Sequence, residues 1–185
     1  KHYLRPDRPH AFFSASKYRW VNYDVQRMVE SIMEMDAKRK GTELHDLAHK
    51  LILHEQKLPE LPLTLNMYVN DAIGYRMVSE QLLVYSENCF GTADAIKYDD
   101  IKKILRVHDL KTGANKTSEK QLYVYVAIWC LEYHVRPFEI EIECRIYQND
   151  EVRVYIPTGD EIAHVMDKIK TFDKWIKQRR LEEDL

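Results

Sequence analysis

Residues 89–113 read CFGTADAIKYDDIKKILRVHDLKTG and contain two apolar segments separated by a polar turn. The segments 89–98 and 104–110 are rich in β-branched and aromatic residues, and Asp99 and Asp100 stand between them. Short segments of this kind, bounded by turn residues, are typical of antiparallel strands. The stretch therefore predicts a β-hairpin that carries one acidic residue inside each strand, Asp94 in the first and Asp109 in the second.

The rest of the chain alternates between the helical and the strand period. Helices are expected at 14–38, 42–54, 65–77, 119–134 and 159–180, and further strands at 81–85, 138–147 and 152–156. In 42–54 the apolar face expected to turn inward comprises Leu44, Leu47, Ala48, Leu51 and Ile52, and His49 is expected on the helix surface. In 138–147 the alternation predicts the inward residues Phe138, Ile140, Ile142, Cys144 and Ile146. Ser14 and Thr42 are placed to cap the first two helices, and Gly41 is expected to separate them. This order predicts one mixed α/β domain over 14–185, preceded by a polar lead-in at 1–13.

The composition excludes several classes of protein. The 185 residues are 45% hydrophobic and 31% charged, with 5 Gly and 6 Pro, which excludes disordered and collagen-like chains. The sequence has no run of 18 apolar residues and no apolar signal-peptide core near residue 1, so no membrane association is expected. Three cysteines without a CxxC pair favour a reducing, cytoplasmic location. A net charge of -2 means that any contact with DNA must use a local basic patch.

The two acids and a lysine of the hairpin suggest a metal site. Asp109 and Lys111 project from the same face of a strand, and hairpin pairing would bring Asp94 toward Asp109. Two close carboxylates repel unless a cation lies between them, and oxygen ligands suit Mg²⁺ or Mn²⁺. A lysine beside such a cation is placed to hold water or to neutralise charge on a phosphate. The alternative is a surface ion pair between Asp109 and Lys111, ahead of a turn at Thr112 and Gly113.

Four ordered motifs resemble the RecB-type branch of the PD-(D/E)XK nucleases, which includes phage exonucleases and the nucleases of CRISPR adaptation. They are GTELH at 41–45, GTADAI at 91–96, DLKTG at 109–113 and QLYVYVA at 121–127, and the segment SASKYRW at 14–20 is similar to the family's opening helix. The resemblance implies a restriction-endonuclease-like fold, with a central mixed sheet flanked by helices. It also implies a metal-dependent deoxyribonuclease, most simply an exonuclease of a phage in a bacterial host or of recombination and repair.

The resemblance assigns roles to individual residues. His45, Asp94, Asp109 and the carbonyl of Leu110 would hold Mg²⁺ or Mn²⁺. Lys111 would be the catalytic lysine, with Gln121 and Tyr125 beside it orienting phosphate or water. Glu80 lies just before the first strand, where relatives often carry an acid near the metal. CRISPR-adaptation relatives use four cysteines for an iron–sulfur cluster, whereas this chain has three scattered ones, so no such cluster is expected.

Basic residues near these motifs are the expected DNA contacts. Lys17, Arg19, Lys116 and Lys120 lie on segments that flank the proposed site, where they can follow a phosphate backbone. The sequence does not indicate an oligomeric state.

Three other functions remain open. The segment 45–49, HDLAH, differs by one residue from the HExxH zinc motif, so His45 and His49 could serve a zinc hydrolase. A structure-specific or RNA-cleaving endonuclease of the same fold would use the same site as the exonuclease. A non-catalytic binding module is disfavoured, because the chain keeps the lysine and both acids.

Overall fold

The computed structural model describes residues 15–183, and within them the side chains from residue 18 onward. The chain divides into two compact units, Lys1–Lys40 and Gly41–Leu185. The boundary expected between residues 13 and 14 lies outside the described residues.

The first unit contains a 3-10 helix, η1 (Ala15–Asn22), and the first part of helix α1 (Val25–Leu53). The Asp24 carboxylate accepts a hydrogen bond of 2.7 Å from the backbone N–H of Arg27, so Asp24 caps α1. The cap expected at Ser14 lies outside the described residues.

The expected break at Gly41 was wrong, because α1 continues through this residue to Leu53. Glycine inside a helix costs about 1 kcal/mol relative to alanine. At this position it allows a close approach, since a Cβ on Gly41 would lie 2.7 Å from Oγ1 of Thr112. The glycine therefore lets the loop after strand β3 (Ile104–Leu110) pack against the helix.

The inward face of α1 in the second unit also differs from the expected one. Leu44 and Leu47 were expected to face inward with Ala48, but their exposed fractions are 37% and 44%. The face that turns inward instead contains a glycine, two histidines and two apolar residues: Gly41, His45, Ala48, His49 and Ile52. His49, expected on the helix surface, is thus half-buried.

The second unit contains a five-stranded mixed sheet, which confirms the α/β class. Its strands are β1 (Val78–Ser86), β2 (Cys89–Asp99), β3 (Ile104–Leu110), β4 (Glu141–Gln148) and β5 (Glu151–Tyr155), and they lie in the order of the sequence. Neighbouring strands are antiparallel except β3 and β4, which are parallel and joined through helix α3 (Lys120–Glu132). The expected hairpin of 89–98 and 104–110 is confirmed by the pairing of β2 with β3.

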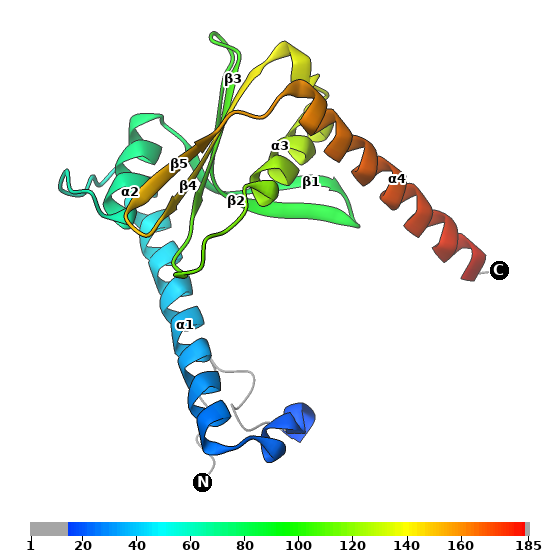
Figure 1. The fold of residues 1–185 in the computed structure, drawn as a ribbon. Coiled ribbons are helices and arrows are strands. Elements are labelled where there is room, and N and C mark those ends of the chain that lie inside the picture. Colours follow the sequence, from blue (N-terminus) through cyan, green and yellow to red (C-terminus); the bar gives the residue numbers. More distant parts are fainter. Residues whose placement is uncertain (1–14, 184–185) are drawn as a thin grey trace. The chain divides into compact units, whose positions relative to one another are not determined.

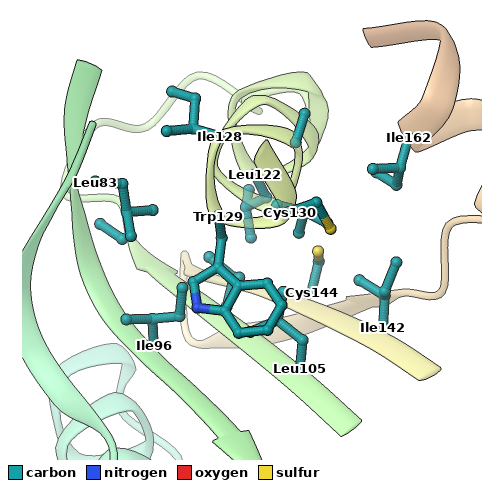
Figure 2. Close-up of a cluster of buried hydrophobic side chains, with 14 of the residues drawn as sticks. Leu83, Ile96, Leu105, Leu122, Ile128, Trp129, Cys130, Ile142, Cys144 and Ile162 are labelled. Carbon is teal, nitrogen blue, oxygen red and sulfur yellow. The ribbon is translucent and has the colours of Figure 1, made fainter. Parts of the chain in front are cut away.

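Helices cover both faces of the sheet, with α2 (Thr64–Gly74) and α3 on opposite sides (Figure 1). Under α3, Trp129 packs over strand residues such as Ile96 and Leu105, and Ile162 of α4 (Gly159–Glu183) joins this core (Figure 2). Under α2, a second core contains Tyr68, Leu110 and Tyr147, together with residues of α1. β3 lies between the two cores, so its side chains are fixed from both sides.

The start of β4 differs from the expected strand 138–147. Residues Pro137–Glu139 form the short helix η2, and β4 begins at Glu141. Phe138, expected to face inward, has an exposed fraction of 65%. The inward positions of Ile142, Cys144 and Ile146 are confirmed, since all three are buried.

Among residues 15–183, none of the helices combines the length and the apolar character needed to cross a bilayer.

Candidate metal centre

Three acidic residues lie in one row across β1, β2 and β3. β2 pairs with β3 through Ala95 and His108, and one further step of the same register places Asp94 opposite Asp109. β1 pairs with β2 at Ser79 with Ala95 and at Gln81 with Ala93, so Glu80 lies opposite Asp94. The register of the sheet thus gathers acids that are far apart in the sequence.

Helix α1 adds a histidine to this row. His45 is half-buried, and its Nδ1 lies 3.6 Å from Oδ2 of Asp94. One donor atom each of His45, Glu80 and Asp94 lie within 4.8 Å of one another, a spacing that one cation could span. Among the residues that the structure describes, this is the group that could hold a metal ion. Glu80, which the resemblance placed only near the metal, belongs to this group of three residues.

Glu80 has an unusual backbone conformation. Its φ angle is +54°, in the left-handed region that residues other than glycine rarely adopt. Such a conformation costs about 1–3 kcal/mol and persists only where the surrounding structure enforces it, often at functional sites. The strained residue lies within β1, at the position where its acid meets Asp94 and His45.

Asp109 is buried with an exposed fraction of 1%, and its Oδ1 has no partner, whereas its Oδ2 pairs with the Lys111 ammonium. Burial, followed by the nearby charge of Asp94, raises the pKa of Asp109 to about 6. Burial also raises the pKa of Asp94 to about 6, although the Leu110 N–H donates to its Oδ2 at 2.8 Å. Buried polar atoms without a partner are uncommon, because they lose their hydration without compensation. A divalent cation would supply the missing partner, so the residues present fit such an ion.

Lys111 is held beside Asp109 by α3. Its Nζ lies 3.0 Å from Oδ2 of Asp109 and donates a 2.9 Å hydrogen bond to Oε1 of Gln121. The amide of Gln121 in turn donates to the Tyr125 hydroxyl at 2.8 Å. The structure therefore assembles Lys111, Gln121 and Tyr125 in one chain of hydrogen bonds.

The carbonyl of Leu110 points toward β2. The neighbouring N–H of Lys111 donates to the Tyr147 carbonyl on β4, whereas the N–H of Leu110 donates to Asp94 on β2. The N–H and C=O of one residue in an extended strand point to the same side. The Leu110 carbonyl thus faces the strand that carries Asp94, the side on which the expected ligand role requires it.

No pattern in the sequence indicates a role for Gln148, which is buried at the end of β4. Its amide donates to the carbonyls of Gly113 at 2.6 Å and Asn115 at 2.7 Å, and its Oε1 accepts from Arg153 at 2.7 Å. These bonds hold the loop between Lys111 and α3. A cavity of about 220 Å³, lined partly by Lys111 and residues on either side of it, lies next to this loop.

The four basic residues expected to contact DNA are divided between the two units. Lys116 and Lys120 are exposed, in the loop after Lys111 and in the first turn of α3. Arg19 is exposed in the first unit, and the side chain of Lys17 lies outside those described. Lys116 and Lys120 thus lie on the segment that leads from Lys111 into α3.

His49 has a partner other than His45. Its Nδ1 lies 2.7 Å from Oγ of Ser79 in a hydrogen bond whose direction depends on the tautomer of the ring. The group around His45 consists of carboxylates and does not include His49. The geometry therefore resembles a carboxylate-rich site for a hard cation more than a zinc site with two histidines.

No protein-family model matches this chain, and no curated protein matches it either.

Proposed function

We propose that this protein is a deoxyribonuclease that depends on Mg²⁺ or Mn²⁺ and acts as an exonuclease on linear DNA. One observation carries the proposal: a buried carboxylate with one unpartnered oxygen, Asp109, lies in a row of acids with a lysine beside it. Hydrolysis of a phosphodiester needs these two kinds of group, since carboxylates hold a cation and a lysine neutralises charge on phosphate.

The residues of the row would hold the cation together. His45, Glu80 and Asp94 offer three donor atoms, and Asp109 is positioned as a further ligand. When bound, a divalent cation polarises a phosphate oxygen and lowers the pKa of water, which makes hydroxide available near neutral pH. An imidazole ligand is softer than Mg²⁺ prefers, so Mn²⁺ should bind more tightly.

Lys111 would act on the substrate rather than on the metal. A lysine ammonium donates up to three hydrogen bonds and accepts none, so it cannot coordinate a cation. Gln121 accepts one of its hydrogens and Asp109 faces a second, which fixes the direction of the ammonium and leaves the third for a phosphate oxygen or for the attacking water. Tyr125 holds the amide of Gln121, and so fixes the lysine indirectly.

The basic residues near the centre would guide the DNA strand. Lys116 and Lys120 lie on the loop and helix that follow Lys111, close in sequence to the residue that would meet the scissile phosphate. With a net charge of -2 overall, such a local patch suits a narrow strand path more than a broad duplex-binding face.

The test compares linear DNA with covalently closed circles, each single- and double-stranded, together with RNA and casein, in Mn²⁺ and in chelator. The proposal expects metal-dependent degradation of linear DNA alone. Equal cutting of circles would make the protein an endonuclease, and RNA cleavage would change the substrate. Casein cleavage that a zinc chelator blocks, with DNA intact, would contradict the proposal and support the hydrolase that uses His45 and His49.

A further inference from the structure

A hydrogen bond joins the two elements that carry His45 and Glu80. His49 lies one helical turn after His45 on the same face of α1, and Ser79 directly precedes Glu80 in β1. Nδ1 of His49 and Oγ of Ser79 are 2.7 Å apart, and both side chains are half-buried. The bond thus lies beside both metal ligands without involving either.

Apolar packing is incomplete around this bond. A cavity of about 280 Å³ lies here between α1, the end of α2 and the start of β1, and its walls include His49, Ser79, Ile52 and Met77. Side chains that leave such a space do not fix a helix against a strand as closely as a filled core does. The hydrogen bond therefore contributes an alignment that packing here does not supply.

Alignment matters at this point because Glu80 is strained. Its φ angle of +54° would relax toward an ordinary strand conformation if β1 were free to shift. Ser79 is held on its backbone side by pairing with Ala95 and on its side-chain side by His49. These two attachments fix the residue immediately before the strained one.

We infer that Ser79, through His49, is a positioning residue that sets the spacing between His45 and Glu80 for metal binding. The inference rests on the proposed metal site and goes beyond it, since neither Ser79 nor His49 is among the proposed ligands. Groups that orient metal ligands without touching the ion commonly change metal affinity by about 10–100-fold when they are mutated.

The test is a calorimetric titration of Mn²⁺ into the full chain, with the melting temperature of the metal-free protein measured alongside. S79A should weaken Mn²⁺ binding by about tenfold or more. S79T keeps the hydroxyl and should restore the affinity of the unmodified protein. H49F keeps a ring but lacks the nitrogen, so it should match S79A. The double variant H49F/S79A should be no weaker than either single variant, because both remove the same bond.

Ser86 offers a matched control on the same strand. Its hydroxyl donates a 2.6 Å hydrogen bond to Asp173 of α4, with no proposed metal ligand beside it. S86A should leave Mn²⁺ affinity unchanged even where its melting temperature falls as much as that of S79A. Unchanged affinity in both S79A and H49F, or equal weakening in S86A, would overturn the inference. An unmodified protein that binds no Mn²⁺ would instead contradict the proposed function.

Discussion

At the scale of single residues, the candidate centre lowers the stability of the metal-free fold. Asp94 and Asp109 are carboxylates whose pKa burial raises to about 6, so their ionised forms are disfavoured in the metal-free fold. Lys111 lies 3.0 Å from Asp109 but does not restore its pKa to the ordinary range. Residues chosen only for stability would not place two acids opposite each other on adjacent strands. A cation between them, as proposed above, would offset this cost.

Replacing Asp109 by asparagine should stabilise the metal-free protein. Asparagine has nearly the same shape as aspartate but carries no charge. The raised pKa of Asp109 corresponds to a cost of about 2–3 kcal/mol for keeping the buried carboxylate ionised. Because asparagine needs its own hydrogen bonds, we expect part of this gain, a rise of several degrees in Tm near neutral pH. Scanning calorimetry with and without Mn²⁺ measures it.

The same variant should lose most of the stabilisation that Mn²⁺ gives to the unmodified protein, since bound metal raises Tm only through its site. Asp46→Asn, at an exposed position of α1, serves as the control and should behave as the unmodified protein in both conditions. A lower Tm for Asp109→Asn without metal, or an undiminished response to Mn²⁺, would argue against a role for Asp109 in the site.

At the scale of elements, α3 approaches the sheet closely at a glycine. A Cβ on Gly91 of β2 would lie 3.0 Å from Cε1 of Tyr125. Tyr125 is the last member of the hydrogen-bonded chain that begins at Lys111. The small residue in β2 thus allows the ring that orients Gln121 to lie against the strand.

Gly91→Ala should therefore lower the rate of DNA cleavage while leaving Mn²⁺ affinity nearly unchanged. The added methyl group displaces the Tyr125 ring and, through Gln121, the lysine, but contacts no proposed ligand. A misplaced catalytic group commonly costs up to 10²-fold in rate. Single-turnover cleavage at saturating Mn²⁺ gives the rate. Gly74→Ala is the control, because no atom lies within 4 Å of its added Cβ; equal rates for the two variants would refute the role of this contact.

Helix α4 is fastened to the β1–β2 turn by one buried acid. Asp173 accepts hydrogen bonds from Ser86 at 2.6 Å and Asn88 at 2.9 Å, and pairs with Lys177 at 2.7 Å. The ion pair with Lys177 and these hydrogen bonds lower the pKa of Asp173 to about 2. The carboxylate therefore stabilises the folded state.

The stabilisation by Asp173 should depend on pH in a defined direction. A folded pKa below the unfolded value of about 3.9 means that the contribution is complete above pH 4 and is lost as the pH falls toward 2. Asp173→Asn should thus be less stable than the unmodified protein at pH 7, and the difference should narrow below pH 4. Denaturant unfolding at several pH values tests this. The control Asp167→Asn, on the same helix but exposed, should show little difference at any pH.

At the scale of the whole molecule, the sequence predicted the sheet better than the first helix. The hairpin of β2 and β3 and the helix α3 follow from strand and helix periodicity, because these segments bury apolar residues in regular patterns. The grouping of Lys111 with Gln121 and Tyr125 followed from the resemblance to the nuclease family instead. The inward face of α1 could not be predicted in this way, since it buries Gly41, His45 and His49 while Leu44 and Leu47 remain exposed. Close approach and polar contacts, rather than apolar area, determine that face.

The same contrast applies to the candidate centre. Asp94 and Asp109 could be paired from the expected hairpin alone. The position of Glu80 depends instead on the register of β1 and on the left-handed backbone conformation of Glu80 itself. The role of Gln148 could not be predicted, because its hydrogen bonds go to backbone carbonyls of the loop at Gly113 and Asn115, and no sequence pattern predicts the path of that loop.

The charge distribution predicts a modest salt dependence of DNA binding. The slope of log K against log salt changes by about 0.7–0.9 per phosphate contact, so Lys116→Ala and Lys120→Ala should each reduce it by about 1. Fluorescence anisotropy at several salt concentrations, with Ca²⁺ or chelator to prevent cleavage, measures the slope. Lys102→Ala, in the turn at the other end of β2 and β3, should leave it unchanged. Unchanged slopes in all three variants would place the DNA path elsewhere.

The cleavage rate of linear DNA by Lys111→Ala at saturating Mn²⁺, beside that of the unmodified protein, tests the central claim most directly. Lys111 is the group proposed to act on phosphate and not on metal, so its removal should cost about 10²–10³-fold or more in rate. Mn²⁺ affinity, measured on the same preparation, should remain, because lysine is not a ligand. Cleavage by Lys111→Ala at the full rate, or no metal-dependent cleavage by the unmodified protein, would contradict the account.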